Sequence, residues 1–184
     1  INEIINGDIH TANQKAAGLE SRDQAKTFIY ALIYGAGDAK LGSVVKGSRE
    51  DGKRLRQHFF DSNPSFKALR DKVSRASKKG YLKGLDGRKI FIRSEHAALN
   101  SLLQGGGAVI MKKGLALFDS LIKLNTFDAK FVANIHDEWQ MEVREDLSDH
   151  IGTLAVDCIK TAGNYYNLRC PMDGEYKVGR DWSE

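Results

Sequence analysis

The chain has 184 residues, 41% hydrophobic and 28% charged, which is ordinary for a globular protein with a sizeable core. Its 28 Lys and Arg residues outnumber 24 Asp and Glu residues, and the net charge of +4 permits a polyanionic partner without requiring one. It has two cysteines, no apolar run near the roughly 18 residues of a membrane span, and no signal-peptide pattern at the N-terminus. These features exclude a disulfide-rich secreted protein and a membrane-spanning protein, and they predict a cytoplasmic location.

The first strong pattern in the chain is an amphipathic helix at residues 21–35, within SRDQAKTFIYALIYGAG. The residues just before it, DIHTANQKAAG, predict a shorter helix. Ser21 followed by Gln24 is a capping-box start, and Gly35 is a typical helix end. The apolar side chains of this helix fall mostly on one face and can be buried: Ala25, Phe28, Ile29, Leu32 and Ile33.

A stripe of polar side chains runs along the same helix at intervals of four residues: Arg22, Lys26, Tyr30 and Tyr34. Residues four apart lie on one slowly drifting face. Two cations near the positive end of the helix dipole, followed by two rings, suit a ligand with phosphates and an aromatic base. From spacing alone, the alternative is a surface helix with solvated charges and half-buried tyrosines.

Residues 38–80 predict short helices separated by glycines and by Pro64, and most of their many cations fit solvated helix faces. Residues 81–94, YLKGLDGRKIFIRS, predict a β-hairpin with an Asp-Gly turn. A long helical pattern follows at 96–123, interrupted by the glycines at 105–107. Three consecutive glycines in a helix predict a kink, tight packing, or the close approach of a ligand backbone.

Residues 130–144 change to a period of two, with His136-Asp137 at the tip of a predicted hairpin. A carboxylate on a tight turn between paired strands is held rigidly and points outward, as a ligand of a divalent metal must. The alternative is an ordinary turn aspartate. Residues 146–162 then predict another amphipathic helix.

Taken together, these motifs resemble family A DNA polymerases, the DNA polymerase I family, and most closely the replicative type of T-seven-like bacteriophages. The pattern R-x3-K-x3-Y-x3-Y-G resembles the nucleotide-binding helix of the fingers (motif B), and His136-Asp137-Glu138 resembles the catalytic palm hairpin (motif C). The segment DIH resembles the one that precedes motif B, and GLDGRK resembles the connecting segment. The resemblance covers essentially the whole chain, in the family's order.

For the fingers helix, the resemblance implies that Arg22 and Lys26 bind the triphosphate of the incoming deoxynucleoside triphosphate. Lys26 would also neutralise, and could protonate, the departing pyrophosphate. Tyr30 would lie beside the sugar, Tyr34 would stack near the nascent base pair, and Gly35 would allow close approach.

For the second half, the resemblance implies that Asp137 binds two catalytic Mg²⁺ ions, that Glu138 supports the site, and that His136 approaches the primer end. Asn100 and Gln104, one helical turn apart, would contact the minor groove. Amide donors there test pairing geometry without selecting a sequence, because minor-groove acceptors are nearly the same for every base pair.

Two further side chains, Arg88 and His96, are candidate contacts to primer-template DNA. The expected architecture is α+β, with a mostly helical fingers subdomain at 1–80 and part of a palm at 81–184 that carries long helices and the antiparallel hairpin.

The other catalytic carboxylate of this family lies in a D-x-S-x-x-E-x-R strand (motif A), and no such string occurs in the sequence. We therefore expect an N-terminal polymerase part, with motif A, thumb and possibly an exonuclease, in the same chain or in a separate one. We expect this chain alone to be inactive.

Two other functions remain open from the sequence. One is a non-catalytic DNA-binding module derived from a polymerase, in which the basic region 46–93 grips DNA. The other is a metal phosphohydrolase built on His136-Asp137, although the remaining histidines show no helical metal spacing.

Overall fold

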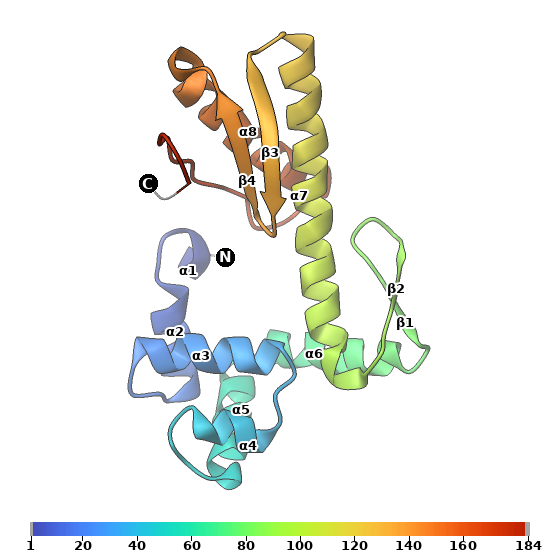
Figure 1. Cartoon of the computed structure of the whole chain (residues 1–184). Helices are drawn as coiled ribbons and strands as arrows, with labels where there is room; N and C mark the ends of the chain where they lie inside the picture. The colour runs from blue at the N-terminus through green and yellow to red at the C-terminus, as the bar shows by residue number, and fades with distance from the viewer. Residues whose placement is uncertain (1, 183–184) are drawn as a thin grey trace. The chain divides into compact units, whose positions relative to one another are not determined.

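The computed structural model describes residues 2–182, which form helices and two antiparallel hairpins (Figure 1). The mixture confirms the predicted α+β class. No helix in this described range is long and apolar enough to cross a membrane. The elements, in chain order, are α1 (Asn2–Ile5), α2 (Ile9–Ala17), α3 (Arg22–Ile33), α4 (Asp38–Ser43), α5 (Arg49–Ser62), α6 (Pro64–Ser77), β1 (Tyr81–Lys83), β2 (Lys89–Phe91), the 3₁₀ turn η1 (Glu95–Ala97), α7 (Ala98–Leu124), β3 (Ala129–Ile135), β4 (Glu138–Val143), the 3₁₀ turn η2 (Glu145–Leu147) and α8 (Ser148–Tyr165).

The chain forms two compact units, Ile1–Gln104 and Gly105–Glu184, and α7 begins in the first and ends in the second. The predicted division into fingers and palm at residues 80 and 81 concerns function, and it stays a prediction.

The core of the first unit forms around the apolar face of α3. Phe28 is fully buried there and meets Phe59 of α5 edge-on, with ring centroids 5.7 Å apart. Edge-to-face pairs of this kind add to the stabilisation that burial of the rings provides. The other buried members of this cluster come from α2 to α5 and the loop after α2: Ala17, Leu19, Ala25, Ile29, Leu32, Leu41 and Phe60.

Helices α4 and α5 pack backbone to backbone at two glycines. A Cβ atom on Gly52 would lie 1.9 Å from the carbonyl oxygen of Asp38, and one on Gly42 would lie 1.9 Å from that of Ser48. An ion pair between Arg56 and Asp38 joins the same two helices. Any side chain at Gly52 would therefore force the two helices apart.

The start of α5 has the capping box that its sequence favours. Ser48 Oγ accepts from the backbone N–H of Asp51, while the Ser48 backbone N–H donates to the Asp51 carboxylate. Because both Ser48 groups donate to the carboxylate, the pKa of Asp51 falls to about 2.

The hairpin β1–β2 has the predicted Asp86-Gly87 turn, with Tyr81 opposite Phe91. The hairpin packs against the beginning of α7 in a second hydrophobic cluster, whose buried members are Val73, Leu82, Ala98 and Leu99. The predicted long helix is confirmed, and α7 continues as one helix through all three glycines. A Cβ on Gly106 or Gly107 would meet no described atom within 4 Å, so tight packing does not explain these two glycines.

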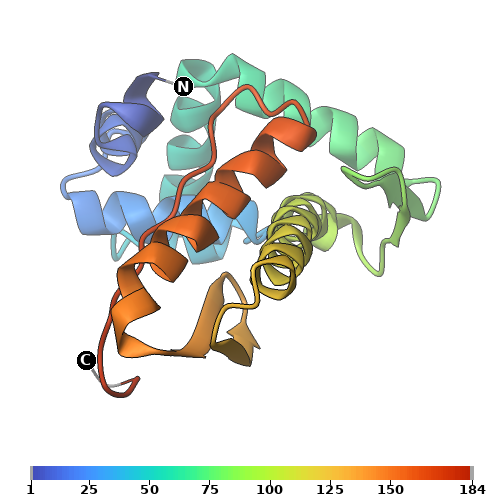
Figure 2. The same ribbon diagram turned by 90° about the horizontal axis from the view of Figure 1, so that it is seen from above.

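In the second unit, one face of the hairpin β3–β4 packs against α7 and α8. Phe118 of α7 is fully buried between Phe131 and Trp139, with ring centroids 5.6 and 5.7 Å away. Ile151 and Cys158 of α8 complete this cluster. Figure 2 shows α7 nearly end-on, with α8 and the hairpin beside it. The predicted hairpin is thus confirmed, with a bulge in β3 between Phe131 and Ala133.

The glycine contact between α4 and α5 allows a test of whether close packing outweighs helix propensity at Gly52. Gly52→Ala improves helix propensity, yet we expect it to lower the free energy of unfolding by about 1–3 kcal/mol, because its Cβ meets backbone atoms. The matched control is Gly107→Ala in α7, whose Cβ would meet no atom within 4 Å in the described residues. It should raise stability by up to about 1 kcal/mol. Urea unfolding followed by circular dichroism measures both, and equal effects would contradict the packing argument.

Candidate nucleotide and primer-template site

The helix α3 separates its residues into a buried face and a solvent-facing stripe. Ala25, Phe28, Ile29 and Leu32 are buried. The stripe that the spacing predicted is exposed along its whole length: Arg22, Lys26, Tyr30 at 49% and Tyr34 at 56%. An exposed tyrosine pair on a helix whose other face is fully packed leaves both rings able to stack on a ligand.

The start of α3 differs in detail from the predicted capping box. Ser21 caps the helix as expected, its side chain accepting from the backbone N–H of Gln24 at 3.2 Å. The Gln24 side chain, however, accepts from the backbone N–H of Glu20 at 3.2 Å, one residue earlier than in the box. The helix therefore begins at the predicted residue with half of the predicted box.

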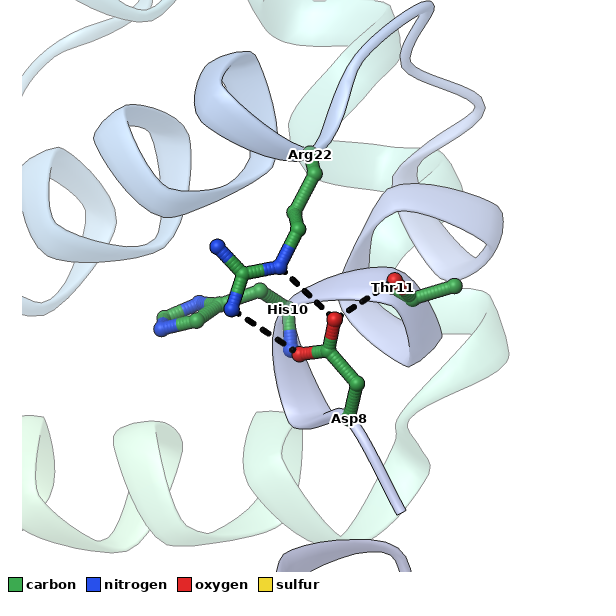
Figure 3. A network of polar contacts seen from close by, with 4 residues as sticks. All are labelled: Asp8, His10, Thr11 and Arg22. Carbon is green, nitrogen blue, oxygen red and sulfur yellow. Dashed lines mark hydrogen bonds and ion pairs between the residues drawn. The ribbon is translucent and has the colours of Figure 1, made fainter.

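Arg22 is held by a carboxylate from another helix (Figure 3). Its Nε donates to Asp8 Oδ2 at 2.7 Å and its Nη2 donates to Asp8 Oδ1 at 3.4 Å. Asp8 is also the N-cap of α2 and accepts from the backbone N–H of His10 and from Thr11 Oγ. Arg22 first, then Thr11, hold the pKa of the Asp8 carboxyl well below its usual range.

The sequence predicted no role for Asp8 beyond its place in the DIH segment. An aspartate before an amphipathic run is a recognisable N-cap. Its contact with Arg22, fourteen residues later, depends on how α2 and α3 pack, so no local signal could have shown it.

The far end of α3 packs against the segment that enters α7. Gly35 has φ of +79°, and a Cβ there would lie 2.1 Å from the backbone oxygen of His96. Gln104 Nε2 donates to Tyr34 Oη at 3.0 Å, across seventy residues of sequence. The structure thus brings together Tyr34 and Gln104, which the resemblance assigned to the nascent base pair and to the minor groove.

The other candidate DNA contacts of the first unit lie on three different elements. Asn100 lies one turn before Gln104 on α7 and is half-buried, and His96 is exposed in η1. Arg88 is exposed but donates from Nε to Asp86 Oδ2 at 2.6 Å, so its guanidinium is oriented by the hairpin turn. That pairing lowers the pKa of Asp86.

In the second unit, the two-residue tip between β3 and β4 presents Asp137 to solvent. Ile135 pairs with Glu138 directly below it, and His136 has φ of +54°, a left-handed conformation uncommon for residues other than glycine. Asp137 and Glu138 are both exposed, and Glu138 accepts from Gln140. The tip therefore projects two carboxylates and an imidazole from one rigid hairpin.

These residues fit part of a magnesium site. Among the side chains that the structure describes, no group of three or more from His, Cys, Asp or Glu is placed to hold a metal ion. Asp137 and Glu138 provide the hard oxygen donors that Mg²⁺ prefers, but a two-metal site needs a further carboxylate. A phosphohydrolase built on His136-Asp137 would likewise need further metal ligands.

Comparison with known proteins agrees with this geometry. The family model for DNA polymerase family A matches residues 3–184. A DNA-directed DNA polymerase of Escherichia phage Phieco32 is 41% identical over 97% of this chain and 30% of its own length. That of Escherichia phage T7 is 38% identical over 98% of this chain and 29% of its own length.

A solved structure, the POL domain of Pol1 from M. smegmatis in complex with DNA primer-template and dNTP, has a TM-score of 0.77 at 25% identity. It matches 85% of this chain and 31% of that one. The chain therefore spans about 30% of the length of the phage relatives. With its motifs on the elements described above, the chain belongs to DNA polymerase family A.

Proposed function

We propose that this chain is the C-terminal portion of a template-directed DNA polymerase, which adds deoxynucleotides to a primer 3′-end by two-metal phosphoryl transfer. The observation that carries the proposal is the solvent-facing stripe of α3, with its cations at the N-terminal end of the helix and its rings at the other. Family membership and the polymerase activity named for the phage relatives support it.

In this proposal the triphosphate binds at the beginning of α3. Arg22 and Lys26 lie one turn apart on its exposed face, where the helix dipole also favours negative charge. Lys26 has no ion pair within the described residues, so its ammonium is available to a phosphate. It would neutralise the departing pyrophosphate and could donate a proton to it.

The rings and amides would position the nascent base pair. Tyr30 lies beside the sugar, and Tyr34 stacks near the pair while its hydroxyl accepts from Gln104. Asn100 and Gln104 donate to minor-groove acceptors, which are nearly the same for all correct pairs. His96 and Arg88 contact the primer-template backbone, and Gly35 leaves room for the nucleotide.

At the hairpin tip, Asp137 would hold the metal, Glu138 would support the tip, and His136 would approach the primer end. Mg²⁺, when bound, would supply Lewis-acid activation of the primer hydroxyl and charge stabilisation. The residues of this chain meet only part of that requirement. We infer that motif A, the thumb and any exonuclease come from an N-terminal polymerase part, and that the enzyme works in the host cytoplasm.

The first test removes a carboxylate without removing volume. In the complete polymerase that contains this chain, Asp137→Asn should lower kcat at least about 10²-fold, because a metal ligand is lost. Asp157→Asn, the same change at an exposed site on α8, is the matched control and should leave kcat unchanged. Primer extension measures both. Full activity of Asp137→Asn and of Lys26→Ala would favour the non-catalytic DNA-binding module instead.

The second test concerns the contact between Tyr34 and Gln104. Tyr34→Phe keeps the ring and removes the hydroxyl, so it should raise misinsertion by about 2- to 10-fold, the value of one net hydrogen bond. In a Gln104→Ala background the same change should have no further effect. Tyr165→Phe, which removes the hydroxyl of an exposed tyrosine on α8, is the control and should leave misinsertion unchanged. Additive effects of Tyr34→Phe and Gln104→Ala on misinsertion would argue against coupling of the two residues.

The third test concerns the chain alone. The purified 184-residue chain should not extend a primer with Mg²⁺ and deoxynucleotides, because its described residues contain an incomplete metal site. Extension should appear when the N-terminal polymerase part is added. Unaided extension by the chain would show that the required carboxylates all lie within it.

A further inference from the structure

Asp8 is unusual among the exposed carboxylates of the first unit because three donors from different places converge on it. The His10 backbone N–H donates to Oδ1 at 3.0 Å, Thr11 Oγ donates to Oδ2 at 2.8 Å, and Arg22 Nε donates to Oδ2 at 2.7 Å. The first two belong to the N-terminus of α2, and the third reaches from α3. Two hydrogen bonds from α2 therefore orient the Asp8 carboxylate independently of Arg22.

The contact uses one edge of the Arg22 guanidinium. A guanidinium has five N–H donors in a planar fork, and Asp8 takes the Nε donor and one donor of Nη2. Nη1 lies on the side away from Asp8 (Figure 3). Three donors remain, and two of them, one on Nη1 and one on Nη2, share the outer edge and can bind a phosphate in the two-point geometry that guanidinium groups favour.

Both partners are partly open to solvent. The Arg22 side chain is 52% exposed and that of Asp8 is 41% exposed. An exposed arginine normally samples many rotamers, and ordering it reduces affinity for whatever it binds. A carboxylate anchored on a second helix removes that cost in advance.

We propose that Asp8 is a positioning residue for nucleotide binding: it holds Arg22 by the Nε edge so that the outer edge faces the triphosphate. This inference rests on the proposed function, in which Arg22 binds the phosphates. Asp8 itself does not touch the nucleotide. Its negative charge repels the triphosphate weakly, because both groups are exposed and solvent screens the interaction.

The experiment measures nucleotide KM and kcat for primer extension by the complete polymerase that contains this chain. Asp8→Asn removes the charge but keeps a residue that caps helices well, so α2 should persist. Arg22→Ala and the double variant close a double-mutant cycle. Asp51→Asn is the matched control, since Asp51 is also a helix-capping carboxylate paired with a nearby arginine, Arg54.

We expect Asp8→Asn to raise the KM for the incoming nucleotide by about 2- to 10-fold, the cost of ordering one long side chain, with kcat within about 2-fold. The change should vanish in the Arg22→Ala background, and Asp51→Asn should leave KM unaltered. Because Arg22 keeps the pKa of Asp8 low, the carboxylate is ionised throughout the neutral range. The KM difference should therefore be the same at about pH 6.5 and pH 8.5.

Three results would overturn the inference in distinguishable ways. A lower KM for Asp8→Asn would mean that Asp8 competes with the triphosphate for Arg22. An unchanged KM, or the same rise in KM in the Arg22→Ala background, would mean that Asp8 has only a structural role, while the proposed function stands. An Arg22→Ala variant with normal KM would refute the proposed role of Arg22 itself.

Discussion

The burial of one face of α3 is the constraint on which the first unit depends. Phe28 and Ala25 are completely buried, and their packing against α5 and its neighbours fixes the rotation of the helix about its own axis. Once that rotation is fixed, residues at intervals of four on the other side must face solvent. The polar stripe is thus a consequence of the apolar core, and a cavity at Phe28 would loosen the site without touching it.

The two ends of α3 are then secured by contacts of different kinds. At its N-terminal end, an ion pair joins Arg22 to Asp8 on α2. At its C-terminal end, the helix stops against the backbone of His96, with only hydrogen at Gly35 to fill the space. The charged end keeps solvent access, whereas the aromatic end is tied to α7 through the hydrogen bond from Gln104 to Tyr34. In the proposed function, the exposed cations would bind the triphosphate and the anchored aromatic end would contact the nascent base pair.

Local patterns in the sequence were enough for the elements and for the faces of α3 and of the β3–β4 hairpin, because periodicity and turn residues are local properties. Local patterns did not predict contacts between segments that are far apart in the sequence. The glycines at 105–107 left a kink, tight packing and a ligand backbone open as explanations, and α7 runs through them as one helix. The pairing of Asp8 with Arg22, and of Tyr34 with Gln104, joins segments whose approach depends on the packing of whole helices. No local pattern distinguishes such pairs from solvated side chains.

The hairpin tip, which carries the metal ligand of the proposed function, is positioned by residues that lie away from it. A left-handed histidine costs on the order of 1 kcal/mol or more, and it persists only where the surroundings impose it. Here it lies in the two-residue turn between the paired residues Ile135 and Glu138. Two residues beyond Asp137, Trp139 stacks on Phe118 of α7. Because Trp139 is in register with Asn134, the stack fixes both strands at the level just below the turn. The position of Asp137 thus depends on aromatic packing against α7, and weakening that packing would displace the metal ligand of the proposed function before it unfolded the hairpin.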